Sequence, residues 1–139
     1  MPVRTFVDTN ILIYAHDTDH KKKHPIARKL LVDLLTTRSL VVSPQVLQEF
    51  YVNVTRKIAT PLTKRAAREI VDDFSVWCTE TSAADVATAF RIEDEAKISF
   101  WDALICASAL KSGATVLLSE DMNAGQKIAG IQIQNPFKP

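Results

Sequence analysis

The chain has 139 residues, of which 47% are hydrophobic and 24% are charged, and its mean hydropathy is +0.02. This length and composition predict a single domain over residues 1–139 with a real hydrophobic core, and they exclude a disordered chain. The net charge of +1 conceals an asymmetry: residues 1–70 hold 12 Lys and Arg against 6 Asp and Glu, whereas residues 71–139 hold 5 against 10. A basic half beside an acidic half suits a protein that attracts a polyanion, although chance scatter of solvated charges gives the same counts.

Several classes of protein are excluded by what the sequence lacks. No apolar run reaches the roughly 18 residues that a membrane span needs, and the polar residues 8–10 interrupt the apolar N-terminal stretch, which is therefore not a signal peptide. We expect a cytoplasmic protein without a membrane anchor. Cys78 and Cys106 lie far apart and outside any C-x-x-C motif, so reduced thiols are expected. Three glycines are too few for a phosphate-binding loop.

In chain order, short apolar strands alternate with helical patterns. The predicted strands are 3–7, 40–42, 115–118 and 130–133. Helices are predicted over 10–15, 25–37 and 44–58, and then after the N-caps Thr63, Ser82 and Ser99, ending near 77, 96 and 112 respectively. Short apolar strands separated by helices predict an α/β fold, a three-layer α/β/α sandwich around a short central parallel sheet.

Two predicted strands end in acidic residues. Asp8 directly follows the first strand, and Ser119-Glu120-Asp121 directly follows the strand at 115–118. Ligands of such folds bind outside the carboxyl ends of parallel strands. We therefore expect Asp8 and Asp121 at the same edge of the sheet.

Two further acids interrupt helical patterns. Glu49 lies about 60° outside the apolar arc of the helix 44–58, given 100° per residue, and it is either a cleft residue or an ordinary flank residue. Asp102 stands in the first turn of a helix that is apolar almost all round. A first-turn Asp can simply complement the helix dipole, so its functional role also needs other support.

Convergence of Asp8, Glu49, Asp102 and Asp121 on one strand-end cleft would be unfavourable without a cation, because like charges raise each other's pKa. Mg²⁺, or Mn²⁺, is the expected solution, with one or two ions per subunit bound by carboxylates and water. Such ions can activate a water molecule for phosphodiester hydrolysis. This is the most economical chemistry for a chain without a nucleophilic Ser or Cys motif.

Four segments, VDTNILIY, SPQVLQEF, SFWDALICASAL and LLSEDMNAG, occur in the order seen in PIN-domain ribonucleases. The chain resembles the VapC-type toxins of bacterial toxin–antitoxin systems over nearly its full length. The resemblance implies an endoribonuclease dependent on Mg²⁺ or Mn²⁺, a homodimer, and an inhibitory antitoxin partner. It implies that Asp8, Glu49, Asp102 and Asp121 bind metal and are catalytic. It also implies that the polar side chains beside them orient ligands or substrate, namely Thr9, Asn10 and Ser119. Glu120 stands at a variable position and has no predicted role.

Two other functions remain open at this point. Haloacid-dehalogenase-like phosphatases also carry an Asp after the first strand, but they need D-x-D, and Asn10 occupies the second position. A non-catalytic module is the other alternative, either a PIN-fold binding protein or a receiver-like regulator. A receiver needs an acid at the end of a central strand, where this chain has Ser43-Pro44.

The stretch HKKKH carries His20 and His24, which follow His16 at helical spacing. We reject a transition-metal site there because three lysines would repel the ion, and because Pro25 should keep His24 out of a helix. The stretch is interpreted as an exposed basic loop that either contacts phosphate or is simply solvated. The aromatic residues are expected mainly in the core or a dimer contact, and only Tyr14 is near enough to the acids to be a base-stacking candidate.

Overall fold

The structure is a computed structural model that describes residues 3–138, and it contains a five-stranded sheet in the order β2-β1-β3-β5-β4. All neighbouring strands pair in parallel except β4 and β5, which are antiparallel. The strands are β1 (Thr5–Val7), β2 (Leu40–Val41), β3 (Val116–Leu118), β4 (Lys127–Ile128) and β5 (Ile131–Gln134). The predicted α/β class is confirmed. The strand β4 was not predicted: it is as short as β2, but unlike β2 it contains a lysine and only one apolar residue.

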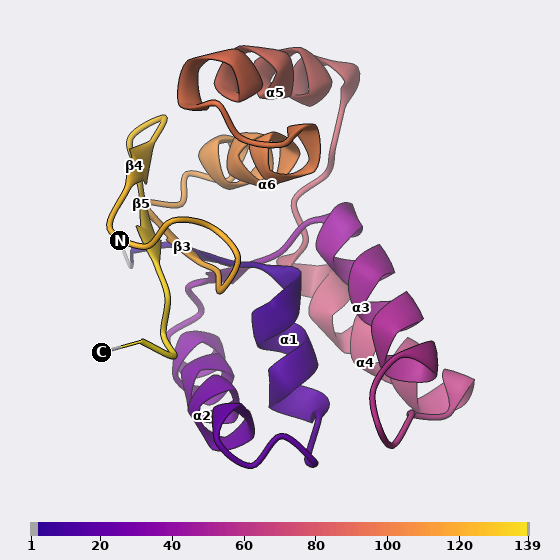
Figure 1. The fold of residues 1–139 in the computed structure, drawn as a ribbon. Helices are drawn as coiled ribbons and strands as arrows, with labels where there is room; N and C mark the ends of the chain where they lie inside the picture. The colour runs from indigo at the N-terminus through magenta and orange to yellow at the C-terminus, as the bar shows by residue number, and fades with distance from the viewer. Residues whose placement is uncertain (1–2, 139) are drawn as a thin grey trace.

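The helices cover both faces of this sheet, as Figure 1 shows. In that view α5 and α6 lie above the sheet and α1 and α2 lie below it, while α3 packs against α1 and α4 packs against α3. Their bounds are α1 (Thr9–His16), α2 (Lys23–Thr36), α3 (Pro44–Arg56), α4 (Lys64–Phe74), the 3₁₀ helix η1 (Ser75–Trp77), α5 (Ala83–Ala96) and α6 (Phe100–Lys111). The arrangement is the predicted three-layer sandwich.

Side-chain caps fix where several helices begin. Thr63 Oγ1 accepts a hydrogen bond of 3.1 Å from the Ala66 amide, and Ser99 Oγ accepts one of 3.1 Å from the Asp102 amide. Each such cap stabilises a helix by about 1 kcal/mol. The predicted starts of α4 and α6 are confirmed.

The predicted start of α2 was wrong. The helix begins at Lys23 rather than Pro25, so His24 is helical. Pro25 lies in the first turn, where backbone amides have no partner within the helix and the missing N–H of proline costs nothing.

The core lies on both sides of the central strands. Phe6 and Val7 of β1, Leu117 of β3 and Ile133 of β5 are fully buried. Continuous apolar strands of this kind are typical of a parallel sheet covered on both faces. No helix within residues 3–138 combines the length and the hydropathy that crossing a bilayer requires.

Candidate active site

Asp8 stands at the carboxyl end of β1 and is the N-cap of α1. Its backbone amide donates to the carbonyl of Leu118 at the end of β3, with a distance of 3.0 Å. Its Oδ1 accepts from the Thr9 amide at 2.7 Å and its Oδ2 accepts from Ser119 Oγ at 2.7 Å. The ends of the two central strands therefore meet at one edge of the sheet, with the Asp8 carboxylate between them.

Ser119 connects this carboxylate to the loop that carries Asp121. The hydroxyl is fully buried, and while it donates to Asp8 it accepts hydrogen bonds from the amides of Asp121 at 3.2 Å and Met122 at 3.4 Å. The side chain of Asp121 is exposed, and its Oδ2 accepts from Asn10 Nδ2 at 3.0 Å. Ser119 and Asn10 thus fix the backbone and the side chain of Asp121 respectively.

Glu49 reaches the same edge from α3. Its exposed side chain accepts a hydrogen bond of 3.1 Å from Thr9 Oγ1, and Thr9 is itself buried beside Asp8. One residue therefore contacts two acids, with its amide on Asp8 and its hydroxyl on Glu49. Of the two interpretations of Glu49 from its helix position, the geometry favours the residue that leans toward the acids.

Asp102 lies in the first turn of α6 and is partly buried. Burial raises the pKa of its carboxyl group, the Ser99 hydrogen bond opposes that rise, and the charge of Asp121 adds to it. The helix N-terminus favours an anion at this position. Asp102 is therefore coupled to Asp121, the acid of the loop after β3.

The pKa of Asp8 reflects its burial and its coupling to two of the other acids. It is raised from 3.8 to about 6, first because the side chain is buried; the Ser119 and Thr9 hydrogen bonds lower it, and the charges of Glu49 and Asp121 raise it further. The ion pairs formed between residues 3–138 involve none of these four acids. Within residues 3–138, the group therefore has negative charge that no Lys or Arg neutralises through an ion pair.

The chemistry of these donors fits a hard divalent cation. Within the described part of the chain, no three His, Cys, Asp or Glu side chains are close enough together to form a ready-made metal cage. Mg²⁺ retains several waters and uses only a few carboxylates, so it does not need a closed cage. The residues that could hold such an ion are Asp8, Glu49, Asp102 and Asp121.

Cys106 lies on α6 behind the acids. Its thiol is buried, and burial together with the charges of Asp102 and Asp8 raises its pKa to about 12. The thiol is therefore protonated at neutral pH and is not a nucleophile. Both cysteines are free thiols.

The stretch HKKKH is not uniformly exposed, which corrects the sequence interpretation. Lys21 and Lys22 are exposed, but Lys23 is partly buried and forms an ion pair with Glu120. His16 packs edge-on against Phe50, with ring centroids 5.3 Å apart, and burial lowers the pKa of its imidazole.

The sequence left the role of Glu120 open and offered Tyr14 only as a stacking candidate, and the structure brings these two side chains together. Glu120 Oε1 accepts a hydrogen bond of 2.8 Å from the Tyr14 hydroxyl. The Tyr14 ring is already packed against His20 and Phe137, with centroids 4.9 and 5.2 Å away. Tyr14 is therefore engaged within the protein rather than available to stack on a base. The pair joins positions 106 residues apart, and no local pattern predicts it.

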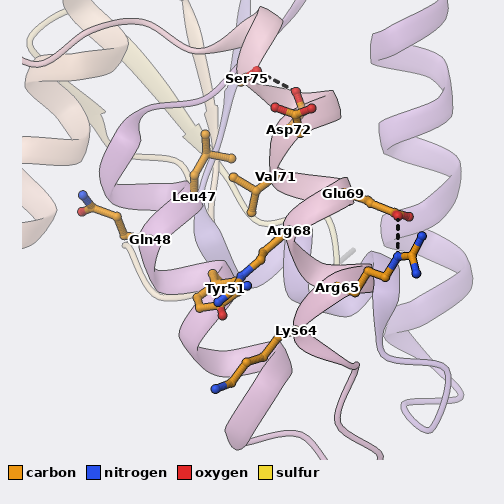
Figure 2. Close-up of a pocket in the computed structure, with 10 residues that line it drawn as sticks. All are labelled: Leu47, Gln48, Tyr51, Lys64, Arg65, Arg68, Glu69, Val71, Asp72 and Ser75. Atoms are coloured by element: carbon orange, nitrogen blue, oxygen red, sulfur yellow. Dashed lines mark hydrogen bonds and ion pairs between the residues drawn. The ribbon is translucent and has the colours of Figure 1, made fainter.

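A groove of about 930 Å³ lies between α3 and α4, and Figure 2 shows the side chains that line it. None of the four acids lines this groove. The Arg68 guanidinium lies over the Tyr51 ring, 5.8 Å from its centroid, and Arg65 pairs with Glu69 at 3.5 Å. The lining residues are Leu47, Gln48, Tyr51, Lys64, Arg65, Arg68, Glu69, Val71, Asp72 and Ser75. Helix α3 thus presents Glu49 to the acids and its neighbour Gln48 to a separate surface.

Solved structures with the same fold include three toxin-related proteins. A toxin–antitoxin complex from Klebsiella pneumoniae has a TM-score of 0.69 and 19% identity, covering 95% of this chain and 97% of the other. VapBC2 from Rickettsia felis, bound to a DNA fragment from its promoter, has a TM-score of 0.66 and 19% identity, covering 96% and 98%. VapC20 from Mycobacterium tuberculosis, described as a toxin that cleaves the Sarcin-Ricin loop, has a TM-score of 0.61 and 20% identity, covering 84% and 91%.

No curated protein matches the sequence. Residues 5–128 match the family described as the PIN domain. This match includes every strand but β5 and all four acids of the strand-end site. The chain therefore belongs to the PIN domain family.

Proposed function

We propose that this protein is an endoribonuclease dependent on Mg²⁺ or Mn²⁺ and acts as the toxin of a toxin–antitoxin pair. In this proposal residues 1–139 form one domain, the protein acts in the cytoplasm, and each subunit of a homodimer binds one or two ions. RNA is the substrate and a cognate antitoxin is the inhibitory partner.

One observation carries the proposal. Asp8, Glu49, Asp102 and Asp121 come from four separate segments and are electrostatically coupled, yet no basic side chain among the described residues pairs with them. Such a group favours a divalent cation. The exposure of Glu49 and Asp121 leaves this edge open to a large substrate such as RNA.

The chain's own residues have distinct tasks in this proposal. Asp8 and Asp121 bind metal while Ser119 and Asn10 hold their oxygens in place. Asp102 binds from the start of α6, and Glu49 binds directly or through water while Thr9 orients it. A bound divalent ion would supply a lowered pKa for the attacking water and positive charge beside the reacting phosphate.

The toxin role is supported by the proteins that share the fold. Their descriptions name a toxin that cleaves the Sarcin-Ricin loop, a toxin–antitoxin complex and a promoter-bound VapBC2 complex. Identities near 20% show that the fold is shared, but they do not show that the substrate is shared. The assignment of RNA as the substrate and of an antitoxin as the partner is therefore part of this proposal.

The direct test uses purified protein and a mixture of cellular RNAs, with RNA ends sequenced after incubation with Mg²⁺ or Mn²⁺. We expect new ends at a small number of sites, and no new ends when EDTA replaces the metal. Cleavage that persists in EDTA would contradict the proposal. Co-expression with the product of an adjacent small reading frame should suppress growth inhibition if that product is the antitoxin.

The alternatives differ in measurable ways. A haloacid-dehalogenase-like phosphatase has little support, since the chain belongs to the PIN family and has Asn10 in place of the second Asp. Hydrolysis of p-nitrophenyl phosphate without cleavage of RNA would favour it. A non-catalytic PIN module would bind RNA or protein without consuming RNA, and calorimetry would detect no Mn²⁺ binding near neutral pH.

A further inference from the structure

Tyr14, Lys23 and Glu120 form a partly buried cluster that includes the residue directly before Asp121. Glu120 Oε2 forms an ion pair with the Lys23 ammonium, and Oε1 accepts from the Tyr14 hydroxyl at 2.8 Å. The ammonium also donates to the Tyr14 hydroxyl at 3.4 Å. The side chains of Lys23 and Glu120 are only 29% and 22% exposed, so solvent screens this pair less than it screens a fully exposed one.

Aromatic rings enclose the ammonium and connect it to other segments. Lys23 Nζ lies 4.8 Å from the centroid of the Tyr14 ring and 5.4 Å from that of Phe137. Cation–π contacts of this kind add to the ion pair. The cluster therefore joins α1, the first residue of α2, the loop after β3 and the C-terminal segment.

Glu120 is also held through its backbone. Its amide donates a hydrogen bond of 3.2 Å to Asn10 Oδ1, and the same Asn10 donates through Nδ2 to Asp121 Oδ2 at 3.0 Å. Both carboxylate oxygens and the backbone amide of Glu120 thus have partners. These contacts also restrict the position of Asp121, which is the next residue in the chain. A Glu120 free of these partners would be an unpaired carboxylate directly beside Asp121 in the chain, and so a competing ligand for its ion.

We propose that the Tyr14–Lys23–Glu120 cluster is a positioning device that orients the Asp121 loop toward Asp8 and Asp102 while it keeps the Glu120 carboxylate out of the metal site. This inference rests on the proposed metal-dependent function. It makes Lys23 and Glu120 positioning residues rather than metal ligands or RNA contacts.

The test compares Lys23→Met and Glu120→Gln with the matched control Lys22→Met, which removes an exposed charge one residue away. The readouts are the Kd for Mn²⁺ by calorimetry, and kcat and KM separately for a cleavable RNA. Loss of a residue that orients a ligand costs about 10–100-fold in metal affinity or activity. We expect Lys23→Met and Glu120→Gln each to weaken Mn²⁺ binding about 10-fold and to lower kcat with KM unchanged. The control should match the wild type.

The double variant separates this proposal from its rivals. Because both residues act through one pair, Lys23→Met combined with Glu120→Gln should be no weaker in Mn²⁺ binding than either single variant. If Glu120 were a metal ligand, Glu120→Gln would weaken binding while Lys23→Met did not. If Lys23 contacted RNA, Lys23→Met would raise KM and leave the Kd for Mn²⁺ unchanged.

Two further outcomes overturn the proposal and can be told apart. Melting temperatures that fall with an unchanged Mn²⁺ Kd would make the cluster purely structural, and the nuclease function would stand. A wild-type protein that neither binds Mn²⁺ nor cleaves RNA would instead overturn the proposed function, and the positioning role with it.

Discussion

Ser119 donates a hydrogen bond of 2.7 Å to the Asp8 carboxylate across 111 residues of sequence, and both groups are buried. The contact joins the end of β3 to the end of β1. It is also the first of the two hydrogen bonds that hold the pKa of Asp8 below the value that burial alone would give.

The stability of the metal-free protein should fall as pH rises through the range set by Asp8. The unfolded carboxyl titrates near 3.8 and the folded one near 6, so between these values the folded state binds more protons than the unfolded state. The unfolding free energy should therefore decrease by about 2 kcal/mol between pH 4 and pH 6 from this group alone, out of about 3 kcal/mol over its whole titration range. Urea denaturation across this range in EDTA measures it. Asp8→Asn lacks this carboxyl and serves as the comparison. An unfolding free energy that rises steadily over the same interval in Asp8→Asn, but not in the wild type, isolates the contribution of Asp8.

Asp8→Asn should stabilise the metal-free protein while it destroys activity. Asn is an equally good N-cap and its side chain carries no charge to desolvate, so at pH 8 the variant should melt at a higher temperature than the wild type in EDTA. A lower melting temperature with disrupted circular dichroism would mean that the charge of Asp8 serves the fold rather than the metal.

Ser119→Ala should weaken metal binding and cleavage about 10–100-fold at pH 7. The variant removes a hydrogen bond that lowers the pKa of Asp8, so protons compete better with the metal, and it also frees the Asp121 loop. Ser112→Ala is the matched control, since that buried serine donates to the Ala109 carbonyl away from the site. Activity of Ser119→Ala should recover in part as pH increases. Equal losses of metal binding and cleavage in both variants would mean that Ser119 has no specific role at the site.

Thr9→Val should lower kcat about 10-fold with little change in stability. The substitution keeps the shape of the side chain and the hydrogen bond from the backbone amide of residue 9 to the Asp8 carboxylate. It removes the hydroxyl that donates to Glu49. Thr9→Ser retains that hydroxyl and should retain most of the activity. RNA cleavage rates of the two variants under saturating Mn²⁺ provide the measurement, and equal rates would mean that the Thr9–Glu49 contact has no functional role.

The sequence predicted those parts of the fold that depend on local signals. The caps Thr63 and Ser99 and the apolar strands around Phe6 and Leu117 each have a pattern within a few residues, and the structure contains all of them. The start of α2 was misplaced because Pro25 is compatible with a first helical turn as well as with a loop.

Contacts between distant segments were beyond local patterns. The meeting of Asp8 and Ser119 at one edge followed from the rule for strand ends, but the Lys23–Glu120 pair did not, because 97 residues separate its members and neither has a periodic environment. The hydrogen bond from the Thr9 hydroxyl to Glu49 was likewise beyond local patterns. The sequence places it beside Asp8, and only the packing of α1 against α3 brings it to Glu49.

The measurement that tests the central claim most directly is the cleavage of a defined RNA by Asp8→Asn and by Asp94→Asn, at matched concentrations and with Mn²⁺ varied. Asp94 is an exposed acid on α5 and serves as the control for loss of one negative charge. We predict that Asp94→Asn cleaves at the wild-type rate with the same Mn²⁺ dependence, and that Asp8→Asn remains folded but loses cleavage at every Mn²⁺ concentration. Wild-type cleavage by a folded Asp8→Asn would contradict the account.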